Sequence, residues 1–169
     1  MTGCRAGGGM RSTHEQEFAE FFDSRSSRLL SAAWMLTGDG HVAEELVQEA
    51  MARTYARWSR VRRGNPAAYT RRTIVNLHTD RWRKRRREVL TDAVPERATS
   101  DDPMSVDLVR ALARLPRRER ECVVLRHYLD LSEAETARTL GVGVGSVKKY
   151  AMNGRRALRD LLEGVESHD

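Results

Sequence analysis

Apolar side chains in the first part of the chain recur at steps of three and four residues, which is the spacing of one face of an α-helix. One such stripe runs from Phe18 to Trp34 and stops at the sequence TGDG, where Gly38 can end a helix. Asp39 is a good N-cap for a second helix, whose apolar stripe continues to Trp58. The hydrophobic pattern therefore predicts two successive amphipathic helices.

A third helix is predicted after the sequence RRGNP, which interrupts the second one. Asn65 suits the N-cap and Pro66 suits the first helical position, because a proline there gives up no helical hydrogen bond. Apolar positions then extend through Trp82 into an arginine run. Since no stretch alternates with the period of two that is typical of a strand, residues 14–88 are predicted to form an all-α domain.

Shorter helical stretches follow in the last third of the chain. Two of them flank Pro116, at residues 105–115 and 117–128. The sequence SEAE, which begins at Ser132, is a capping box for a third, and a last helix is predicted over residues 144–162. This part is predicted to be a second small all-α domain.

A polar, acidic stretch with two prolines joins the two helical parts, and we expect it to be a flexible linker. The glycine-rich start of the chain is expected to be disordered, and Met10 could equally be the start codon. The predicted organisation is a disordered tail at 1–13, a domain at 14–88, a linker at 89–104, a domain at 105–163 and a tail at 164–169.

Residues 133–152 have the residue types that a helix-turn-helix needs at its helix crossing, its turn and its core. Ala137 is small where two helices would cross, and Gly141 suits the turn between them. The positions that can share a core are Leu140, Val142, Val147 and Tyr150. The positions that then face outward, toward a DNA groove, are Ser146, Lys148, Lys149, Met152 and Asn153. Such triplets also occur in helical proteins that never bind DNA, so both interpretations stay open for this segment.

The basic residues are concentrated in one window of the chain. Residues 53–87 contain thirteen Arg or Lys and a single acid, Asp80, which is a local net charge of +12. Since the whole chain carries +6, the remainder sums to −6. A basic block inside an otherwise acidic protein indicates a surface that faces phosphates rather than general solubility.

The basic window has two parts with different chemistry. Residues 81–87 hold six cations, a density at which like charges repel along a helix, so the run either needs an external polyanion or is a solvated helix end. Upstream, an aromatic ring, an amide and guanidiniums fall on one helical stripe, which can contact phosphates and unstacked bases. The stripe consists of Tyr69, Arg72, Asn76, Asp80 and Arg83.

The second predicted helix, HVAEELVQEAMART, is acidic instead. Residues 14–52 contain eight acids and only two basic residues, Arg25 and Arg28. DNA would repel this surface. It is therefore either ordinary solvated surface or a docking site for a basic protein partner.

Enzymatic, metal-dependent and membrane-spanning functions find no support in the sequence. Cys4 and Cys122 lie far apart, and none of the five histidines stands at metal-ligand spacing. The histidines and carboxylates form no catalytic constellation, so we predict no metal, no cofactor and no small-molecule substrate. No apolar run approaches the ~18 residues of a membrane span, and the start lacks the apolar core of a signal peptide. A cytoplasmic protein without membrane insertion is expected.

Four segments occur in order along the chain: TGDGHVAEELVQEAMARTYARW, NPAAYTRRTIVNLHTDRWRKRRRE, LARLPRRERECVVLRHYLDLSEAETARTLGVGVGSVKKY and GRRALRDLL. Together they resemble the bacterial extracytoplasmic-function sigma factors, the minimal two-domain sigma subunits, in the style of actinobacterial members. The resemblance spans residues 15–163. Gly143 stands where the family often has a capping serine, and Asn153-Gly154 replaces an arginine and a small residue.

The resemblance implies a non-enzymatic factor that binds core RNA polymerase and promoter DNA and directs promoter recognition and transcription initiation; an anti-sigma factor is the further partner that it allows. The first domain would correspond to sigma region 2 and the last to sigma region 4. Polymerase contacts are implied for Glu44, Glu45, Gln48 and Glu49. Contacts with the minus-ten element are implied for Arg60, Arg63, Asn65, Tyr69, Arg72, Asn76 and Arg83. Contacts with the minus-thirty-five element are implied for Ser146, Lys148, Lys149 and Met152, with Arg155 and Arg156 nearer the phosphates.

A stand-alone helix-turn-helix regulator is the alternative interpretation. Its first domain would sense a ligand or dimerise, and it would bind its DNA site without a polymerase. The block of net charge +12 beside an acidic helix argues against this alternative.

Overall fold

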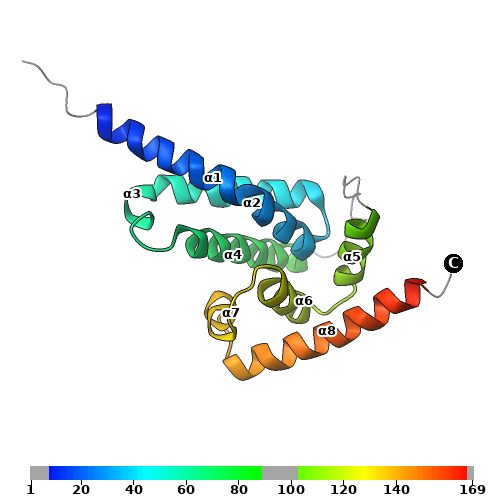
Figure 1. The fold of residues 1–169 in the computed structure, drawn as a ribbon. Coiled ribbons are helices and arrows are strands. Elements are labelled where there is room, and N and C mark those ends of the chain that lie inside the picture. The colour runs from blue at the N-terminus through cyan, green and yellow to red at the C-terminus, as the bar shows by residue number, and fades with distance from the viewer. Residues whose placement is uncertain (1–7, 89–102, 167–169) are drawn as a thin grey trace, which may run out of the picture.

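The computed structural model of the chain describes residues 8–88 and 103–166, and every regular element in these two ranges is a helix (Figure 1). The all-α fold predicted from the hydrophobic periodicity is therefore confirmed. The predictions for residues 1–7, for residues 89–102 of the linker and for residues 167–169 lie outside the described part of the chain.

The first group of helices follows the predicted order. It consists of α1 (Gly8–Thr37), α2 (Gly40–Ala56), α3 (Trp58–Val61) and α4 (Pro66–Arg87). The short α3 was not predicted; it begins directly after α2 and leads into the basic loop before α4. In Figure 1, α1 and α2 run side by side and α4 lies beneath them, while the first turns of α1 project beyond the bundle.

Local polar chemistry sets the helix boundaries as the sequence indicated. Gly38 ends α1 with φ +72°, a conformation that glycine adopts without strain. The Asp39 side chain accepts a hydrogen bond from the backbone N–H of Val42 at 3.1 Å and so caps α2. The Asn65 side chain caps α4 in the same way, accepting from the N–H of Ala68 at 3.0 Å. These three predictions are confirmed.

The core of the first group fills the space between α1, α2 and α4. Ala33, Leu46, Ala50 and Ile74 are all buried there. Phe18, Phe21 and Trp34 pack against the same cluster at its rim. The apolar stripes that predicted the helices are thus the faces on which the helices meet.

The second group is smaller and begins after the stretch that is not described. It consists of α5 (Pro103–Ala113), α6 (Arg117–Val123), the π-helical turn η1 (Val124–Tyr128), α7 (Glu133–Leu140) and α8 (Val144–Glu166). The capping box is present in both directions between Ser132 and Glu135, and Gly141 ends α7 with φ +68°. Both features were predicted from the sequence.

Some boundaries differ from those predicted. α1 already begins at Gly8 and α8 continues to Glu166, within the stretches expected to be tails, while α5 starts at Pro103, within the expected linker. The glycines near the start give no apolar period from which a helix could be predicted. The stretch predicted as one helix over 117–128 changes its hydrogen bonding at Val124, whose carbonyl accepts from the N–H of Leu129 at 3.1 Å. A single π-helical turn leaves no distinct periodicity in the sequence.

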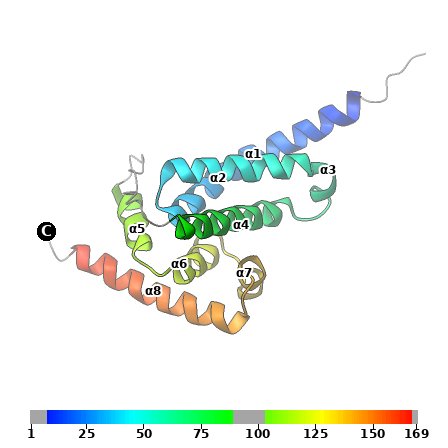
Figure 2. The same cartoon turned by 180° about the vertical axis from the view of Figure 1, so that it is seen from behind.

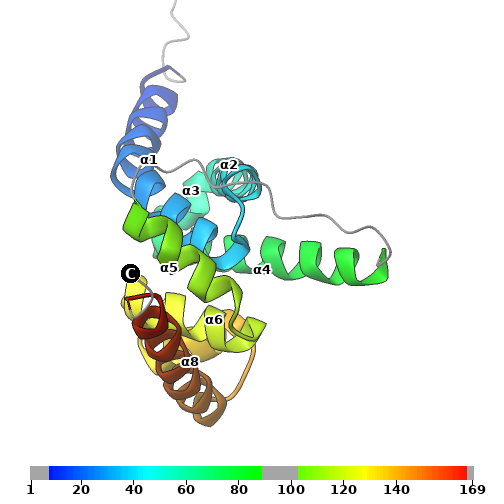
Figure 3. The same cartoon turned by 90° about the vertical axis from the view of Figure 1, so that its right-hand side faces the viewer.

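The two groups of helices pack against each other (Figure 2). α4 lies against α7, and α5 lies across the last turns of α1, as Figure 3 shows from the side. α8 forms the layer farthest from α2 and rests on α6 (Figure 1). The sequence predicted two domains joined by a flexible linker, and the packing of the two groups against each other was not predicted.

The close crossing of α6 and α8 depends on a glycine in the middle of α8. A Cβ atom on Gly154 would lie 2.7 Å from a methyl group of Val123 and 3.0 Å from the backbone carbonyl oxygen of Glu119. The sequence Asn153-Gly154, which departs from the family pattern, therefore places a residue without a side chain where the two helices touch.

We expect Gly154→Ala to lower the free energy of unfolding by about 1–2 kcal/mol, because overpacking outweighs the gain in helix propensity. Gly164→Ala in the same helix is the matched control, since a Cβ there meets nothing within 4 Å. That control should be neutral or stabilising by up to about 1 kcal/mol. Urea unfolding followed by circular dichroism measures both variants, and equal stability of the two would contradict the close crossing.

His78 of α4 makes the stability of the fold depend on pH. Burial, followed by the nearby guanidiniums of Arg120, Arg117 and Arg85, lowers the pKa of its imidazole from 6.5 to about 4. The unfolded chain therefore binds this proton more readily than the folded one. The contribution of the neutral His78 to the free energy of unfolding is therefore fully present above pH 6.5, and it is lost as the pH falls toward 4.

We expect the free energy of unfolding to fall by about 2 kcal/mol between pH 7 and pH 5 through this histidine. His78→Gln should remove most of that dependence. His41→Gln is the control, because the His41 side chain is 77% exposed, and it should leave the dependence intact. Urea unfolding at the two pH values measures this difference. If the free energy of unfolding of His78→Gln still fell by the same amount as that of the wild type, other groups would be responsible for the pH dependence.

Candidate nucleic-acid and polymerase interface

The last turn of α3 and the loop before α4 present free cations on a rigid support. Arg60 and Arg63 are exposed, and neither has an ion pair or a side-chain hydrogen bond within the described residues. Arg62 of the same loop is instead paired with Glu17 of α1. The loop is therefore anchored by one arginine while two others remain available to a ligand.

An aromatic cluster underneath fixes this loop in place. The ring of Phe18 meets Trp58 edge to face at 5.2 Å and Tyr55 at 4.9 Å between centroids. Trp58 is the first residue of α3, so the cluster joins α3 to α1. Phe22 and Tyr55 remain 39% and 46% exposed at its edge. Both residues belong to the apolar stripes from which the first two helices were predicted, yet the structure leaves them partly exposed.

The predicted minus-ten residues of α4 lie along one side of that helix. Tyr69 is half-buried, and its hydroxyl oxygen accepts a hydrogen bond from Arg57 at 3.2 Å. Arg72, Asn76 and Arg83 are exposed. The side chain of Asn65 differs from the others because it caps α4, so only its amide N–H groups remain for a ligand.

The arginine run continues α4 as a regular helix to Arg87, although like charges crowd it. Trp82 accounts for part of this order, since the guanidiniums of Arg86 and Arg117 lie 5.2 and 4.3 Å from the centre of its ring. Arg81 is neutralised by Glu45 of α2 at 2.8 Å.

The acidic face of α2 divides into paired and free side chains. Glu45 accepts from Arg81, a hydrogen bond that lowers the pKa of its carboxyl group, and Glu49 pairs with Arg53 at 2.6 Å. Glu44 and Gln48 are exposed and have no such partner among the described residues. All four predicted polymerase-contact residues are on α2, but only these two are uncommitted.

The predicted recognition helix is the first part of α8. Its inner side is fixed by Val147, which is fully buried with Leu140 of α7, and Val142 and Tyr150 pack at the edge as predicted. Its outer side is open, with Met152 56% exposed. The exposed predicted contacts are Ser146, Lys148, Lys149, Met152, Arg155 and Arg156.

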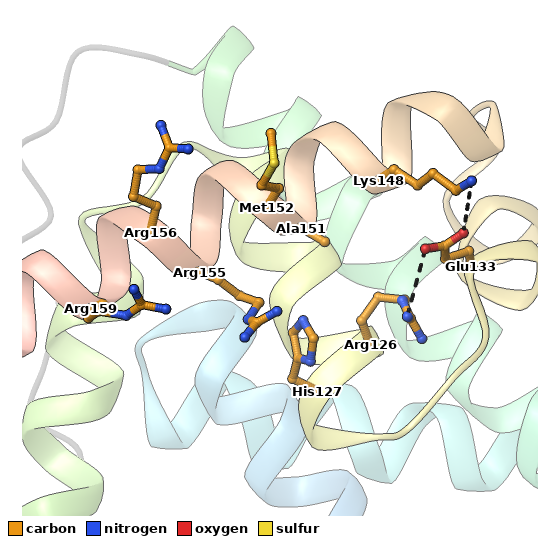
Figure 4. Close-up of a pocket in the computed structure, with 9 residues that line it drawn as sticks. All are labelled: Arg126, His127, Glu133, Lys148, Ala151, Met152, Arg155, Arg156 and Arg159. Atoms are coloured by element: carbon orange, nitrogen blue, oxygen red, sulfur yellow. Dashed lines mark ion pairs between the residues drawn. The ribbon is translucent and has the colours of Figure 1, made fainter.

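A cavity of about 360 Å³ lies between this helix and η1 (Figure 4). Cationic side chains from both elements line it, and Glu133 is the acid among them. Glu133 lies 3.7 Å from Lys148 and 3.9 Å from Arg126. The lining residues are Arg126, His127, Glu133, Lys148, Ala151, Met152, Arg155, Arg156 and Arg159.

His127 lies at the centre of this basic surface, next to Arg155 in Figure 4. Burial first, and then the charges of Arg155 and Arg126, lower the pKa of His127, while Asp130 opposes the shift. The imidazole is therefore neutral near pH 7. A phosphate group in this cavity could accept hydrogen bonds from several guanidinium groups that surround the neutral His127 ring.

No group of three or more His, Cys, Asp or Glu side chains within the described residues could hold a metal ion. Likewise, no helix in that part of the chain is long and apolar enough to cross a membrane.

Two protein families match the chain, one on each side of the linker. Residues 21–88 match sigma-70 region 2, and residues 105–158 match sigma-70 region 4. The RNA polymerase sigma-E factor of Streptomyces coelicolor is 38% identical over 90% of this chain and 88% of its own length. That of Streptomyces avermitilis is 36% identical over 90% and 87%. The chain belongs to the extracytoplasmic-function sigma factors.

The fold of this sigma factor also has a solved counterpart. The sigma factor RpoE of Bartonella quintana, solved with the anti-sigma factor NepR, superposes with a TM-score of 0.72 at 23% identity. The match covers 88% of this chain and 98% of RpoE. The resemblance predicted from the four sequence segments is thus confirmed at the level of the family and the fold.

Three basic residues of the cavity in this sigma factor were missed by the sequence analysis: Arg126, His127 and Arg159. Arg159 could have been found, because it follows Arg155 by one helical turn. Arg126 and His127 could not, since only tertiary packing brings η1 next to α8.

Proposed function

We propose that this sigma factor binds core RNA polymerase and directs it to promoters. It contributes recognition rather than catalysis, so it is not itself an enzyme, and it acts in the cytoplasm where the polymerase works. The observation that carries the proposal is the pairing of two exposed basic surfaces, on the α3–α4 loop and on α8, with an acidic face on α2 that DNA would repel.

The outward face of α2 is proposed to dock on core polymerase. Glu44 and Gln48 are exposed and uncommitted, so a basic partner surface can engage them without breaking an existing pair. Glu45 and Glu49 could contact the polymerase only after breaking their ion pairs with Arg81 and Arg53 and forming new pairs with cations of the partner. This supports a docking surface centred on the free pair.

The loop and the adjoining face of α4 are proposed to bind the minus-ten element in its opened form. Arg60 and Arg63 supply cations for the backbone phosphates, while Tyr69 offers a ring on which an unpaired base can stack. Arg72, Asn76 and Arg83 continue along the helix. A mixed aromatic, amide and guanidinium surface suits single-stranded DNA better than a regular duplex.

The first part of α8 is proposed to enter the major groove of the minus-thirty-five element. Ser146, Lys149 and Met152 project from the exposed side near the helix start, where a recognition helix meets base edges. Arg155 and Arg156 lie one turn further on, beside the basic cavity, and suit phosphates. An anti-sigma factor stays a prediction of the family resemblance.

Co-purification tests the proposal against the stand-alone regulator. Tagged full-length protein is incubated with actinobacterial core polymerase, and the bound polymerase subunits are quantified. The proposal predicts stoichiometric recovery of core polymerase and weak binding of promoter DNA by the protein alone. Tight, specific DNA binding without any retained polymerase would favour the regulator.

A further inference from the structure

His127 lines two neighbouring cavities beside α8. One is the basic cavity of about 360 Å³, and the other, of about 480 Å³, has apolar walls from Val123 and Leu158. Arg155 and Arg159 also line both cavities. In Figure 4 the Arg155 side chain points toward the His127 ring. The residue is exposed, so a ligand in the basic cavity can reach its imidazole.

The charged groups around this ring are mainly cations. They come from η1 and α8: Arg126, Lys148, Arg155, Arg156 and Arg159. The acids are Glu133 of α7, Glu163 of α8 and Asp130, which follows η1. Glu133 lies 3.7 Å from Lys148. Asp130 is paired with Arg28 of α1 at 3.0 Å. Because two of the three acids already face cations, positive charge dominates around His127.

These surroundings keep the imidazole neutral near pH 7 in the free protein. Burial first, and then the charges of Arg155 and Arg126, lower the pKa of His127, and Asp130 opposes them. A neutral imidazole donates from one ring nitrogen only, whereas the protonated ring donates from both. The free protein therefore holds a side chain in this cavity that can still gain one charge and one donor.

An anion in the basic cavity reverses the electrostatic balance at His127. A DNA phosphate carries one negative charge. An opposite charge within ~4–6 Å favours the charged form of a titratable group. The phosphate would also offset the guanidinium charges of Arg155 and Arg126, which oppose protonation in the free protein. The imidazole should therefore take up a proton when a phosphate enters.

The position of the cavity selects a DNA phosphate rather than a free ion. Lys148 and Met152 of the proposed recognition helix line the same cavity. Lys149 projects from the exposed start of that helix. Phosphate contacts beside a recognition helix fix its register on the duplex. A strand whose bases meet the start of α8 would thus place its backbone at His127.

We propose that His127 is a phosphate-binding residue that takes up a proton when DNA binds to α8, so that the protein holds DNA more tightly as the pH falls from about 8 to about 6. The inference rests on the proposed function, because it takes α8 as a DNA-binding helix. It adds a contact from η1 to that surface and makes the contact depend on pH.

Proton uptake determines the direction of the pH effect. The bound phosphate raises the pKa of His127 above that in the free protein. The affinity for DNA is therefore lowest above both pKa values and rises as the pH falls between them, by up to about tenfold for each pH unit. His78 does not contribute in this range, because its pKa of about 4 keeps it neutral.

Fluorescence anisotropy with the full-length protein tests the proposal. A mixed-sequence duplex of roughly 20 base pairs at low salt serves as the probe, since phosphate contacts do not depend on sequence. Wild-type protein should bind at least ~3-fold more tightly at pH 6 than at pH 8. The slope of log affinity against log salt should also be steeper at pH 6, by up to about one.

Two replacements of His127 give opposite signatures in this assay. His127→Gln cannot take up the proton, so its affinity should be the same at both pH values. His127→Lys carries the charge throughout and should bind tightly at both. His41→Gln is the matched control, because the His41 side chain is 77% exposed on α2, and it should keep the wild-type response. An equal pH response in His127→Gln and wild type would overturn the proposal.

Nuclear magnetic resonance of the imidazole supplies a measurement without any substitution. The pKa of His127 in the wild-type protein should shift upward when the duplex is added. Inorganic phosphate at the same total phosphate concentration should shift it much less, because α8 does not hold a free ion in place. No shift with the duplex would overturn the proposal, as would an equal shift with inorganic phosphate.

The outcomes separate the inference from the proposed function. DNA binding that does not change between pH 6 and pH 8 would overturn only the role of His127. Absence of duplex binding at low salt would remove α8 from the DNA interface and overturn both. Neither measurement uses polymerase, so a chain that failed to bind core polymerase would still report on the histidine.

Discussion

Glu44→Arg combined with Gln48→Ala is expected to lower the recovery of core polymerase at least ~10-fold while leaving the helical circular dichroism signal unchanged. Both side chains are exposed on α2 and neither is engaged by another described residue, so their replacement removes no internal contact. Placing a cation where a basic partner docks creates like-charge contacts that typically cost several kcal/mol. Quantitative co-purification at fixed salt measures the loss.

Asp160→Arg is the matched control for this docking variant, because it makes the same charge change on an exposed position of α8. Its recovery of polymerase should equal that of the wild type. Glu45→Gln is an informative third variant. It breaks the ion pair with Arg81, so it should loosen the contact between α2 and α4 more than it weakens docking. Unchanged recovery with Glu44→Arg/Gln48→Ala would remove α2 from the polymerase interface.

Arg155→Ala is expected to weaken binding of the polymerase complex to promoter DNA by about tenfold, equally for different minus-thirty-five sequences. Arg155 lines the basic cavity beside His127, where a DNA phosphate can accept hydrogen bonds from several guanidinium groups. Loss of one phosphate contact should also reduce the slope of log affinity against log salt by about one. Fluorescence anisotropy over a salt series measures both quantities.

Lys149→Ala should behave differently, because Lys149 projects from the exposed start of α8 and is not held by an ion pair as Lys148 is. If it contacts base edges, its loss lowers discrimination between wild-type and altered minus-thirty-five sequences by ~1–3 kcal/mol. Arg110→Ala on α5 is the control for both variants. Equal affinities of Arg155→Ala and wild type at every salt concentration would place the DNA elsewhere on the protein.

The sequence was informative where structure is decided by neighbours in the chain. Asp39, Asn65 and Ser132 all cap the helices that they were predicted to cap, because each acts on an N–H group within three residues. The inward positions of the helix-turn-helix, such as Val147, also follow from local periodicity. These features needed no knowledge of the rest of the chain.

The sequence was less informative where distant segments meet. Val75 lies outside the apolar stripe that was predicted for its helix, and nothing in the sequence says that Leu125 and Val147 cover it. The pairing of Glu45 with Arg81 likewise joins residues on different helices. Such contacts decide which predicted site residues are free, so the split of α2 into paired and uncommitted acids emerged only from the structure.

The minus-ten and minus-thirty-five residues themselves remain predictions of the family resemblance and of exposure. Their positions on α4, the preceding loop and α8 are compatible with the proposed contacts, apart from Asn65, whose side-chain oxygen is committed to the cap. The packed arrangement adds a condition that the sequence did not suggest: Asn76 and Arg83 face the second group of helices in the free protein.

The central claim is that this chain gives core RNA polymerase a promoter specificity. The most direct measurement is transcription in vitro from fragmented genomic DNA by core polymerase, with and without the full-length protein, followed by mapping of the transcript starts. The account predicts a set of new starts that appear only with the protein and share two upstream sequence elements at a fixed distance from each other. An identical pattern of starts with and without the protein would contradict it.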